Sequence, residues 1–186
     1  MHGTLNSLTL SGVIIFRCTG DAATASDATS KRGNAMNGRG ETKLIFPSLA
    51  DFYASWRDIA YTLVRVVIGY IMFMHGWAKV TGPGFGGVSG MMAKNNLVPG
   101  GAFAGAAMFL ETVGAVCIIV GLFTRFFAAA LAIEMGIAFL VVHMSKGFAA
   151  GQGGFEYVLL LGIVLFAIAI RGGGPYSVDR MIGKEL

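Results

Sequence analysis

Three ionisable residues lie inside stretches of the chain that are otherwise apolar. Arg65 lies in the first such stretch, and Glu111 and Glu134 lie near the middle of the second and third. A charge at the centre of a membrane-spanning helix costs on the order of 3 kcal/mol on insertion scales, so it needs a partner or a wet cavity. One guanidinium leaves one of the two carboxylates without a cation, and such a group at membrane depth is typical of a proton carrier.

The positions of these three residues predict that their side chains meet. Arg65 lies about three residues from the centre of its stretch, which is about 5 Å along a helix and within the reach of an arginine side chain. At 100° per residue, small residues share the helical faces of Arg65 and Glu111, which permits close helix packing in a membrane. The sequence therefore predicts one buried cluster of Arg65, Glu111 and Glu134.

Three further ionisable residues are predicted near the outer membrane surface, beside this cluster. His75 and Lys79 follow Arg65 on or at the edge of its helical face, and Glu156 opens the last apolar stretch. A proton or a polar headgroup would enter at this surface. The complete candidate site is Arg65, His75, Lys79, Glu111, Glu134 and Glu156.

Haem and metal sites are not expected. His143 follows Glu134 by nine residues, about 180° around a straight helix, so the two side chains cannot both face inward. That geometry argues against a haem held between His75 and His143. Cys18 and Cys117 form no CxxC pair and have no metal-ligand spacing, so neither a zinc site nor a dithiol redox motif is predicted.

The elements that must position these residues are apolar helices. Of the 186 residues, 55% are hydrophobic and 13% are charged, about half the usual share of charged residues. Such a composition excludes both a soluble globular domain and a disordered chain. Because a span needs about 20 apolar residues, with some latitude for tilt, we predict an all-α bundle of four transmembrane helices. The four spans are placed at 59–77, 101–123, 126–143 and 155–170.

The chain before the first span is predicted to have two parts. Residues 1–43 form a disorder-like extension, in which Met36 is an alternative start of translation. Residues 44–57 form a short interfacial amphipathic helix, for which Ser48 and Asp51 supply a capping box. The apolar residues with helical spacing in this segment are Leu49, Phe52, Tyr53 and Trp56.

The remaining segments and the charge distribution complete the predicted topology. The membrane domain covers 58–180, a C-terminal tail covers 181–186, and the glycine-rich stretch 81–90 is a flexible loop. Outside the spans, ten Lys and Arg residues lie on the side of both termini and three on the other side. By the positive-inside rule, both termini face the cytoplasm.

The net charge of +4 is explained by this topology and does not indicate a nucleic-acid partner. The sequence contains no nucleic-acid-binding motif.

The order of these features resembles the DoxX family of small four-helix bacterial membrane proteins. The resemblance covers about 61–179 and rests on the string HG at His75, the string ETVG at Glu111, GLFTR at Gly121, GGFE at Gly153 and GGGPYSVD at Gly172. Glu134 is not part of this pattern. The matching single positions are Arg65, Gly69, Gly76, Lys79, Gly114, Gly121, Arg125, Gly172 and Asp179.

The resemblance implies an inner-membrane protein, since relatives are associated with quinone-coupled thiosulfate oxidation and with membrane complexes that handle oxidative or thiol stress. The leading hypothesis is a redox-associated subunit that binds a quinone or a small sulfur or oxidant species near Arg65, His75 and Glu111. Electrons would need a cofactor or partner, so the sequence leaves open whether the chain is itself catalytic.

Three alternatives stay open. One is a scaffold that docks soluble redox, sulfur-metabolism or stress-response partners through its basic tails and 172–179. The second is a small-solute or proton transporter. The third is a purely structural Arg–Glu pair that fixes helix register.

Overall fold

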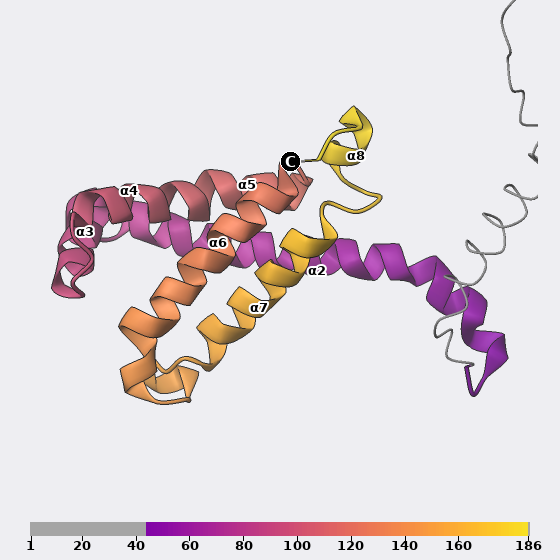
Figure 1. The fold of residues 1–186 in the computed structure, drawn as a ribbon, viewed down its shortest axis with the longest axis horizontal. Coiled ribbons are helices and arrows are strands. Elements are labelled where there is room, and N and C mark those ends of the chain that lie inside the picture. Colours follow the sequence, from indigo (N-terminus) through magenta and orange to yellow (C-terminus); the bar gives the residue numbers. More distant parts are fainter. Residues whose placement is uncertain (1–43, 186) are drawn as a thin grey trace, which may run out of the picture. The chain divides into compact units, whose positions relative to one another are not determined.

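A computed structural model describes residues 44–185, and the predicted extension 1–43, with Met36, lies outside the described residues. The helices belong to one compact unit, Ser48–Leu186. Within the described residues all regular structure is helical and no strand occurs, which confirms the all-α prediction (Figure 1).

Helix α2 (Ala50–Thr81) has 32 residues. At 1.5 Å per residue it is about 48 Å long, which exceeds a hydrocarbon core of about 30 Å. The amphipathic segment predicted at 44–57 is not a separate helix, because α2 continues through it into the first span after a short turn, η1 (Pro47–Leu49). Leu49 occupies the N-cap without a side-chain hydrogen bond, so the predicted capping box of Ser48 and Asp51 is wrong.

The second apolar stretch forms one helical segment, Gly100–Val120, with an interruption at its middle. Helix α4 (Gly100–Phe109) passes into a π-helical turn, η2 (Leu110–Gly114), and then into α5 (Ala115–Val120). A π-helical turn is closed by i→i+5 hydrogen bonds and takes up an additional residue. Side chains after η2 are therefore rotated relative to a regular α-helix.

The third stretch, Thr124–Lys146, is built in the same way. Helix α6 (Thr124–Ala138) leads into a second π-helical turn, η3 (Phe139–His143), and a final 3-10 turn, η4 (Met144–Lys146). Together with α2, these two segments give three helical segments in the described residues that are long and apolar enough to cross a membrane.

The fourth predicted span is a shorter apolar helix, α7 (Glu156–Arg171), which follows a loop containing η5 (Ala150–Gln152). Its 16 residues extend about 24 Å, less than a hydrocarbon core of about 30 Å. Helix α7 runs antiparallel to α6 and lies beside it along its length (Figure 1). Helix α8 (Val178–Ile182) ends the described fold and takes in part of the predicted C-terminal tail.

The glycine-rich stretch predicted as a flexible loop is largely helical. Helix α3 (Gly84–Lys94) packs against α4 (Figure 1). Each interior glycine costs about 1 kcal/mol relative to alanine, which is why composition alone indicated a loop. Val88 of α3 is fully buried, so tertiary packing stabilises a helix that propensity disfavours.

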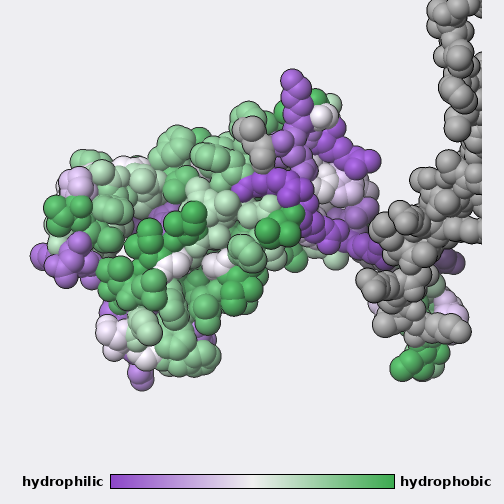
Figure 2. Space-filling view, in the orientation of Figure 1, coloured by the Kyte–Doolittle hydropathy of each residue, from purple (hydrophilic) through white to green (hydrophobic). Residues whose placement is uncertain are grey.

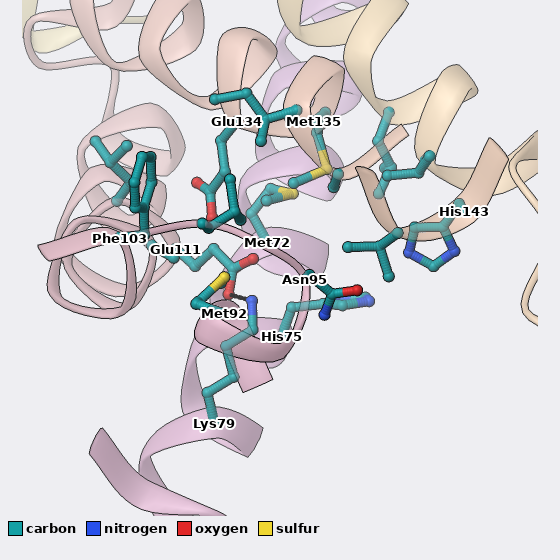
Figure 3. A pocket seen from close by; sticks show the side chains of 18 of the residues that line it. Met72, His75, Lys79, Met92, Asn95, Phe103, Glu111, Glu134, Met135 and His143 are labelled. Carbon is teal, nitrogen blue, oxygen red and sulfur yellow. Dashed lines mark hydrogen bonds and ion pairs between the residues drawn. The ribbon is translucent and has the colours of Figure 1, made fainter. Parts of the chain in front are cut away.

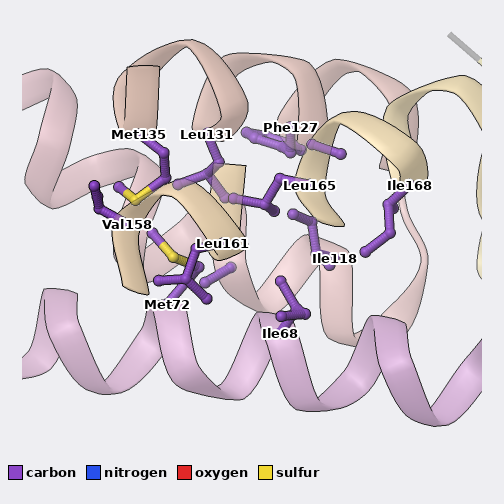
Figure 4. Packing of buried hydrophobic residues seen from close by; sticks show 12 residues of the cluster. Ile68, Met72, Ile118, Phe127, Leu131, Met135, Val158, Leu161, Leu165 and Ile168 are labelled. Carbon is purple, nitrogen blue, oxygen red and sulfur yellow. The ribbon is translucent and has the colours of Figure 1, made fainter. Parts of the chain in front are cut away.

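The hydrophobic core lies between α2, α5, α6 and α7, and its residues recur at helical spacing (Figure 4). The outer surface is apolar as well: Ile133, Phe166 and Leu63 are each more than half exposed. Figure 2 shows hydrophobic side chains over α4, α6 and α7, with hydrophilic ones gathered around α8 and at the opposite ends of the helices. An apolar exterior of this kind suits lipid rather than water. The labelled core residues are Ile68, Met72, Ile118, Phe127, Leu131, Met135, Val158, Leu161, Leu165 and Ile168.

Candidate functional site

The six predicted site residues do not form one cluster. Arg65 donates its hydrogen bonds to backbone carbonyls near the C-terminal end of α5 and to Tyr176, whereas Glu111 pairs with Lys79. Arg65 and Lys79 are fourteen residues apart on α2, which separates them by about 21 Å. The predicted pairing of Arg65 with the glutamates is therefore wrong. The depth estimate failed because α2 extends well beyond the predicted span of 59–77 at both ends.

Arg65 stabilises the end of a helix. Its side chain is 1% exposed, with Nη1 2.7 Å from the carbonyl oxygen of Ile118 and 3.1 Å from that of Ile119, and Nη2 2.6 Å from that of Tyr176. The last carbonyls of a helix lack intrahelical partners and carry a partial negative charge. The guanidinium satisfies two of them in α5 and fastens the segment after α7 to the same point.

Two neighbouring residues serve the turn between α5 and α6. Gly121 has φ +77°, a left-handed conformation that favours glycine, and a Cβ there would collide with Arg65 and Ser177. Asp179 is 1% exposed and accepts hydrogen bonds from the backbone N–H groups of Phe123, at 2.7 Å, and Thr124, at 2.9 Å. Asp179 thereby caps the start of α6 from a distant part of the sequence. We call Arg65, Gly121, Thr124, Ser177 and Asp179 the arginine cluster.

The end of α7 is held at the same end of the fold. Arg125 donates to the carbonyls of Ile170, at 2.5 Å, and Ala169, at 3.3 Å, and its Nε lies 2.8 Å from an oxygen of Glu185. The hydroxyl group of Tyr61 donates to the carbonyl of Gly172, the C-cap residue of α7. The predicted C-terminal tail is thus partly docked on the fold. At this end of the fold, most of the motif positions behind the family resemblance cap helix ends or form hydrogen bonds with them.

The other motif glycines let helices approach closely. A Cβ on Gly76 would lie 2.7 Å from the backbone carbonyl of Glu111, so this glycine sets the distance between α2 and η2. Gly69 likewise faces Ile119, and Gly114 faces the ring of Phe127. These close contacts agree with the predicted use of small residues in packing.

A cavity of about 590 Å³ lies farther along α2 than the arginine cluster, beside Met72, His75 and Lys79. Figure 3 shows side chains that line it. We call it the pocket. Its walls come from α2, α3, α4, η2, α6, η3 and α7, and they are mostly apolar. Four of the predicted site residues line it, together with a histidine and an asparagine that were not predicted to do so. The main polar lining residues are His75, Lys79, Asn95, Glu111, Glu134 and His143.

Lys79, Glu111 and Glu134 form the charged wall of the pocket. Glu111 is 2% exposed and makes an ion pair with the Nζ of Lys79. The carboxyl group of Glu134 lies beside that of Glu111 at the same wall, and the two side chains lie next to each other in Figure 3. One ammonium group beside two carboxyl groups leaves one of them without a cation among the described residues. Oε2 of Glu134 is buried without a hydrogen-bond partner in the described residues.

Both π-helical turns bear on this pocket. Glu111 lies in η2, and His143 is the last residue of η3. The prediction that His143 points away from Glu134 is wrong, because η3 breaks the regular 100° rotation on which that prediction relied. Single π-helical turns inside α-helices occur frequently at functional sites. No feature of residue spacing revealed either turn.

The remaining predicted residues take peripheral positions. His75 lines the pocket but is exposed, and its ring stacks on that of Tyr157. Glu156 is exposed at the start of α7 and is not part of the lining. Asn95 was missed because it follows α3, which was predicted as a loop. Four methionines, also missed, line the walls, and their flexible side chains suit a ligand of irregular shape: Met72, Met91, Met92 and Met135.

The arrangement suits a small amphipathic molecule. Apolar walls with a few convergent polar groups are typical of ligand sites, and such sites have volumes of about 300–1,000 Å³. Two carboxyl groups and a lysine at one wall can donate and accept protons. Among the described residues, no group of three or more His, Cys, Asp or Glu side chains is placed to hold a metal ion.

Three apolar membrane-length helices with an apolar outer surface define an integral, multi-pass membrane protein. Residues 60–144 match the family model for DoxX. A Haemophilus influenzae protein, described as uncharacterized, is 30% identical over 134 residues, which cover 70% of this chain and 96% of the relative. The chain therefore belongs to the DoxX family.

A second uncharacterized protein of Haemophilus influenzae is 29% identical over 89 residues, covering 48% of this chain and 59% of that protein. No solved structure matches the chain. The family match includes Lys79, Glu111, Glu134 and His143 and ends before α7.

Proposed function

We propose that this protein binds a quinone, or a small redox-active molecule of similar shape, in the pocket and acts as a membrane subunit of a redox system. The observation that carries the proposal is the carboxyl pair of Glu111 and Glu134, joined to Lys79, at one wall of an apolar cavity. A quinone combines a flat apolar ring with two carbonyl oxygens. The apolar walls would hold the ring, and the ammonium group of Lys79 would donate to a carbonyl oxygen.

Proton transfer is the chemistry that the charged wall can supply. Reduction of a quinone to a hydroquinone takes up two electrons and two protons. A proton held by the carboxyl pair would be available next to the cavity, and Lys79, which is partly exposed, would connect the pair to the outside. The electrons would come from a partner protein or cofactor, so the chain need not be catalytic by itself. Arg65 has no part in this proposal, since its Nη1 and Nη2 atoms donate to backbone carbonyl groups and it does not line the pocket.

The alternative role as a docking scaffold has less support. In the segment 172–179, which would carry the contacts, Ser177 and Asp179 are buried and hydrogen-bonded within the fold. Basic side chains at the same end are also engaged: Arg125 pairs with Glu185, and Arg171 lies over the ring of Tyr61. A transporter of a small solute or of protons would use the same pocket and stays as the second candidate function.

For the membrane arrangement, we propose four spans in the inner membrane with both termini on the cytoplasmic side. The antiparallel course of α7 beside α6 supports a fourth crossing, and a tilted α6–α7 pair or local thinning of the bilayer would accommodate its 16 residues. The exposed aromatic side chains of Phe52, Tyr53 and Trp56 support an interfacial position for the start of α2. Green fluorescent protein fused after Glu185 should fluoresce, and alkaline phosphatase fused there should be inactive. The reverse result would exclude this topology.

The proposed function is tested by titrating the full-length protein in nanodiscs with a short-chain quinone. Glu111→Gln keeps the size of the side chain and one acceptor oxygen but removes its charge. We expect this variant to bind the quinone at least about tenfold more weakly, the loss that accompanies one strong polar interaction. Glu156→Gln is the matched control, because Glu156 is an exposed carboxylate outside the pocket. Equal affinity in the two variants and the unaltered protein would overturn the proposal.

A further inference from the structure

We propose that the pocket selects ligands that carry hydroxyl hydrogen-bond donors, so that it binds a hydroquinone in preference to the corresponding quinone. This inference rests on the proposed function and deepens it by specifying the form of the ligand. It follows from the hydrogen-bonding state of the polar atoms that line the pocket, and above all from its two histidines.

Each histidine uses one ring nitrogen on a backbone carbonyl. The Nδ1 atom of His143 lies 2.7 Å from the carbonyl oxygen of Gly153, and that of His75 lies 2.9 Å from the carbonyl oxygen of Ile71. A carbonyl oxygen only accepts, so Nδ1 of each ring carries the hydrogen. In a neutral imidazole the other nitrogen, Nε2, is then an acceptor.

The positions of both rings are fixed by the fold. The π-helical turn η3 brings His143 to the pocket, and the hydrogen bond to Gly153 holds it there. His75 stacks on Tyr157 with 6.1 Å between ring centroids. The described residues provide no protein partner for either Nε2 atom, so these acceptors are available to a ligand.

The rest of the lining supplies both acceptors and donors. Oε2 of Glu134 is buried without a partner in the described part of the chain, and it accepts when the carboxyl group is ionised or holds its proton on the other oxygen. On the donor side, Lys79 already uses one N–H group on Glu111, and Asn95 uses one on the carbonyl of Met91. Tyr157 can donate or accept.

A ligand's own hydrogen-bonding groups decide how well it matches this lining. A quinone presents two carbonyl oxygens, which only accept, and so leaves Nε2 of His143 and Oε2 of Glu134 without a hydrogen-bond donor. A hydroquinone presents two hydroxyl groups, which donate to those acceptors and still accept from Lys79. Because unsatisfied polar atoms in an apolar site lower affinity, the hydroxyl form is favoured.

The test compares the two forms of one molecule. A short-chain quinone and its hydroquinone are titrated, without oxygen, into the full-length protein in nanodiscs. We expect the hydroquinone to bind about tenfold more tightly, the effect of one additional satisfied polar group. In His143→Gln, whose amide supplies both a donor and an acceptor, the preference should narrow to about threefold or less. Met144→Gln is the matched control, because Met144 is exposed, lies outside the pocket lining, and should leave the preference unchanged.

The outcomes separate the inference from the proposed function. Tighter hydroquinone binding that depends on His143 supports both. Equal or tighter quinone binding, weakened by Glu111→Gln, overturns the inference and leaves the proposed function standing. Absence of binding by either form overturns both. Nitrogen-15 NMR of the histidine rings gives an independent reading: the inference requires Nε2 of His143 to be unprotonated in the free protein, and a protonated Nε2 would contradict it.

Discussion

The arginine cluster and the charged wall of the pocket both hold buried ionised groups, but their partners differ in kind. Arg65 and Asp179 bind backbone groups at the ends of α5 and α6. Glu111, in contrast, pairs in the described residues with another ionisable side chain, Lys79, and lies beside Glu134 at the wall of a cavity. Backbone partners at helix ends are fixed by the fold, whereas side-chain partners beside a cavity can exchange protons and contact a ligand.

Each region also leaves one buried polar atom without a partner among the described residues, Nε of Arg65 and Oε2 of Glu134. Only Glu134 lines the pocket. Burial and charge alone therefore do not identify a functional residue in a membrane helix. The type of partner, and the space beside it, separate structural charges from those available for chemistry.

The largest expected effect is loss of stability on changing Arg65. Arg65→Met leaves the carbonyl groups of Ile118, Ile119 and Tyr176 without their donor, and removal of a fully buried charged partner costs about 3–5 kcal/mol. Thermal unfolding in detergent measures this cost. Arg57→Met is the matched control, since Arg57 is exposed on the same helix and should change stability by no more than about 0.5 kcal/mol. Equal unfolding temperatures for the two variants would refute the structural role of Arg65.

Removing the other charge of the arginine cluster is expected to have a smaller effect of the same kind. Asp179→Ala deprives Phe123 and Thr124 of the acceptor for three hydrogen bonds and should cost about 2–3 kcal/mol. Quinone affinity of the protein that remains folded should not change. Glu185→Ala removes an exposed carboxylate nearby and should cost less than about 1 kcal/mol. If Asp179→Ala weakened quinone binding without lowering stability, Asp179 would act in ligand binding, and the assignment of the arginine cluster to structure alone would be wrong.

A substitution at Gly76 tests the packing that positions Glu111. In Gly76→Ala the new Cβ would lie 2.7 Å from the backbone of Glu111, so α2 and η2 must separate, at a cost of about 1–3 kcal/mol. Gly90→Ala, in α3, places its Cβ in open space and should stabilise that helix by up to about 1 kcal/mol. The two alanine variants should therefore shift the unfolding temperature in opposite directions. An unchanged or higher unfolding temperature in Gly76→Ala would show that α2 and η2 are not in close contact.

The smallest effect on stability is expected at Glu134. Glu134→Gln retains the shape of the side chain and should change the free energy of unfolding by less than about 1 kcal/mol. It removes one member of the carboxyl pair, so the infrared band of a protonated carboxyl group should disappear at neutral pH. Glu156→Gln should retain that band. Its persistence in Glu134→Gln would show that the two glutamates do not share a proton.

Hydropathy and helical spacing predicted the helices and part of their packing. The apolar stretches give the helical spans, and the small residues on the Arg65 and Glu111 faces correctly indicated close contact between these helices. The partner of Glu111 was missed because the predicted first span ended before Lys79, whereas α2 continues to Thr81. Hydropathy locates the end of an apolar stretch, and a helix can extend beyond it.

The place of His143 in the pocket could not have been predicted in the same way. The position of His143 depends on a π-helical turn, and neither the residues of η3 nor those of η2 carry a spacing signal for one. The role of Asp179 was equally hidden, since it caps a helix that begins 55 residues earlier in the sequence. Both features arise from tertiary packing.

Mapping the binding position of a quinone tests the central claim most directly. A short-chain azidoquinone is photo-crosslinked to the full-length protein in nanodiscs, and the labelled peptides are identified by mass spectrometry. We expect labels on peptides that line the pocket, at Met72, Glu134 or Tyr157, and their loss when unmodified quinone is added in excess. Labels confined to the lipid-facing Leu63 and Phe166, or to the arginine cluster at Asp179, and insensitive to the competitor, would contradict it.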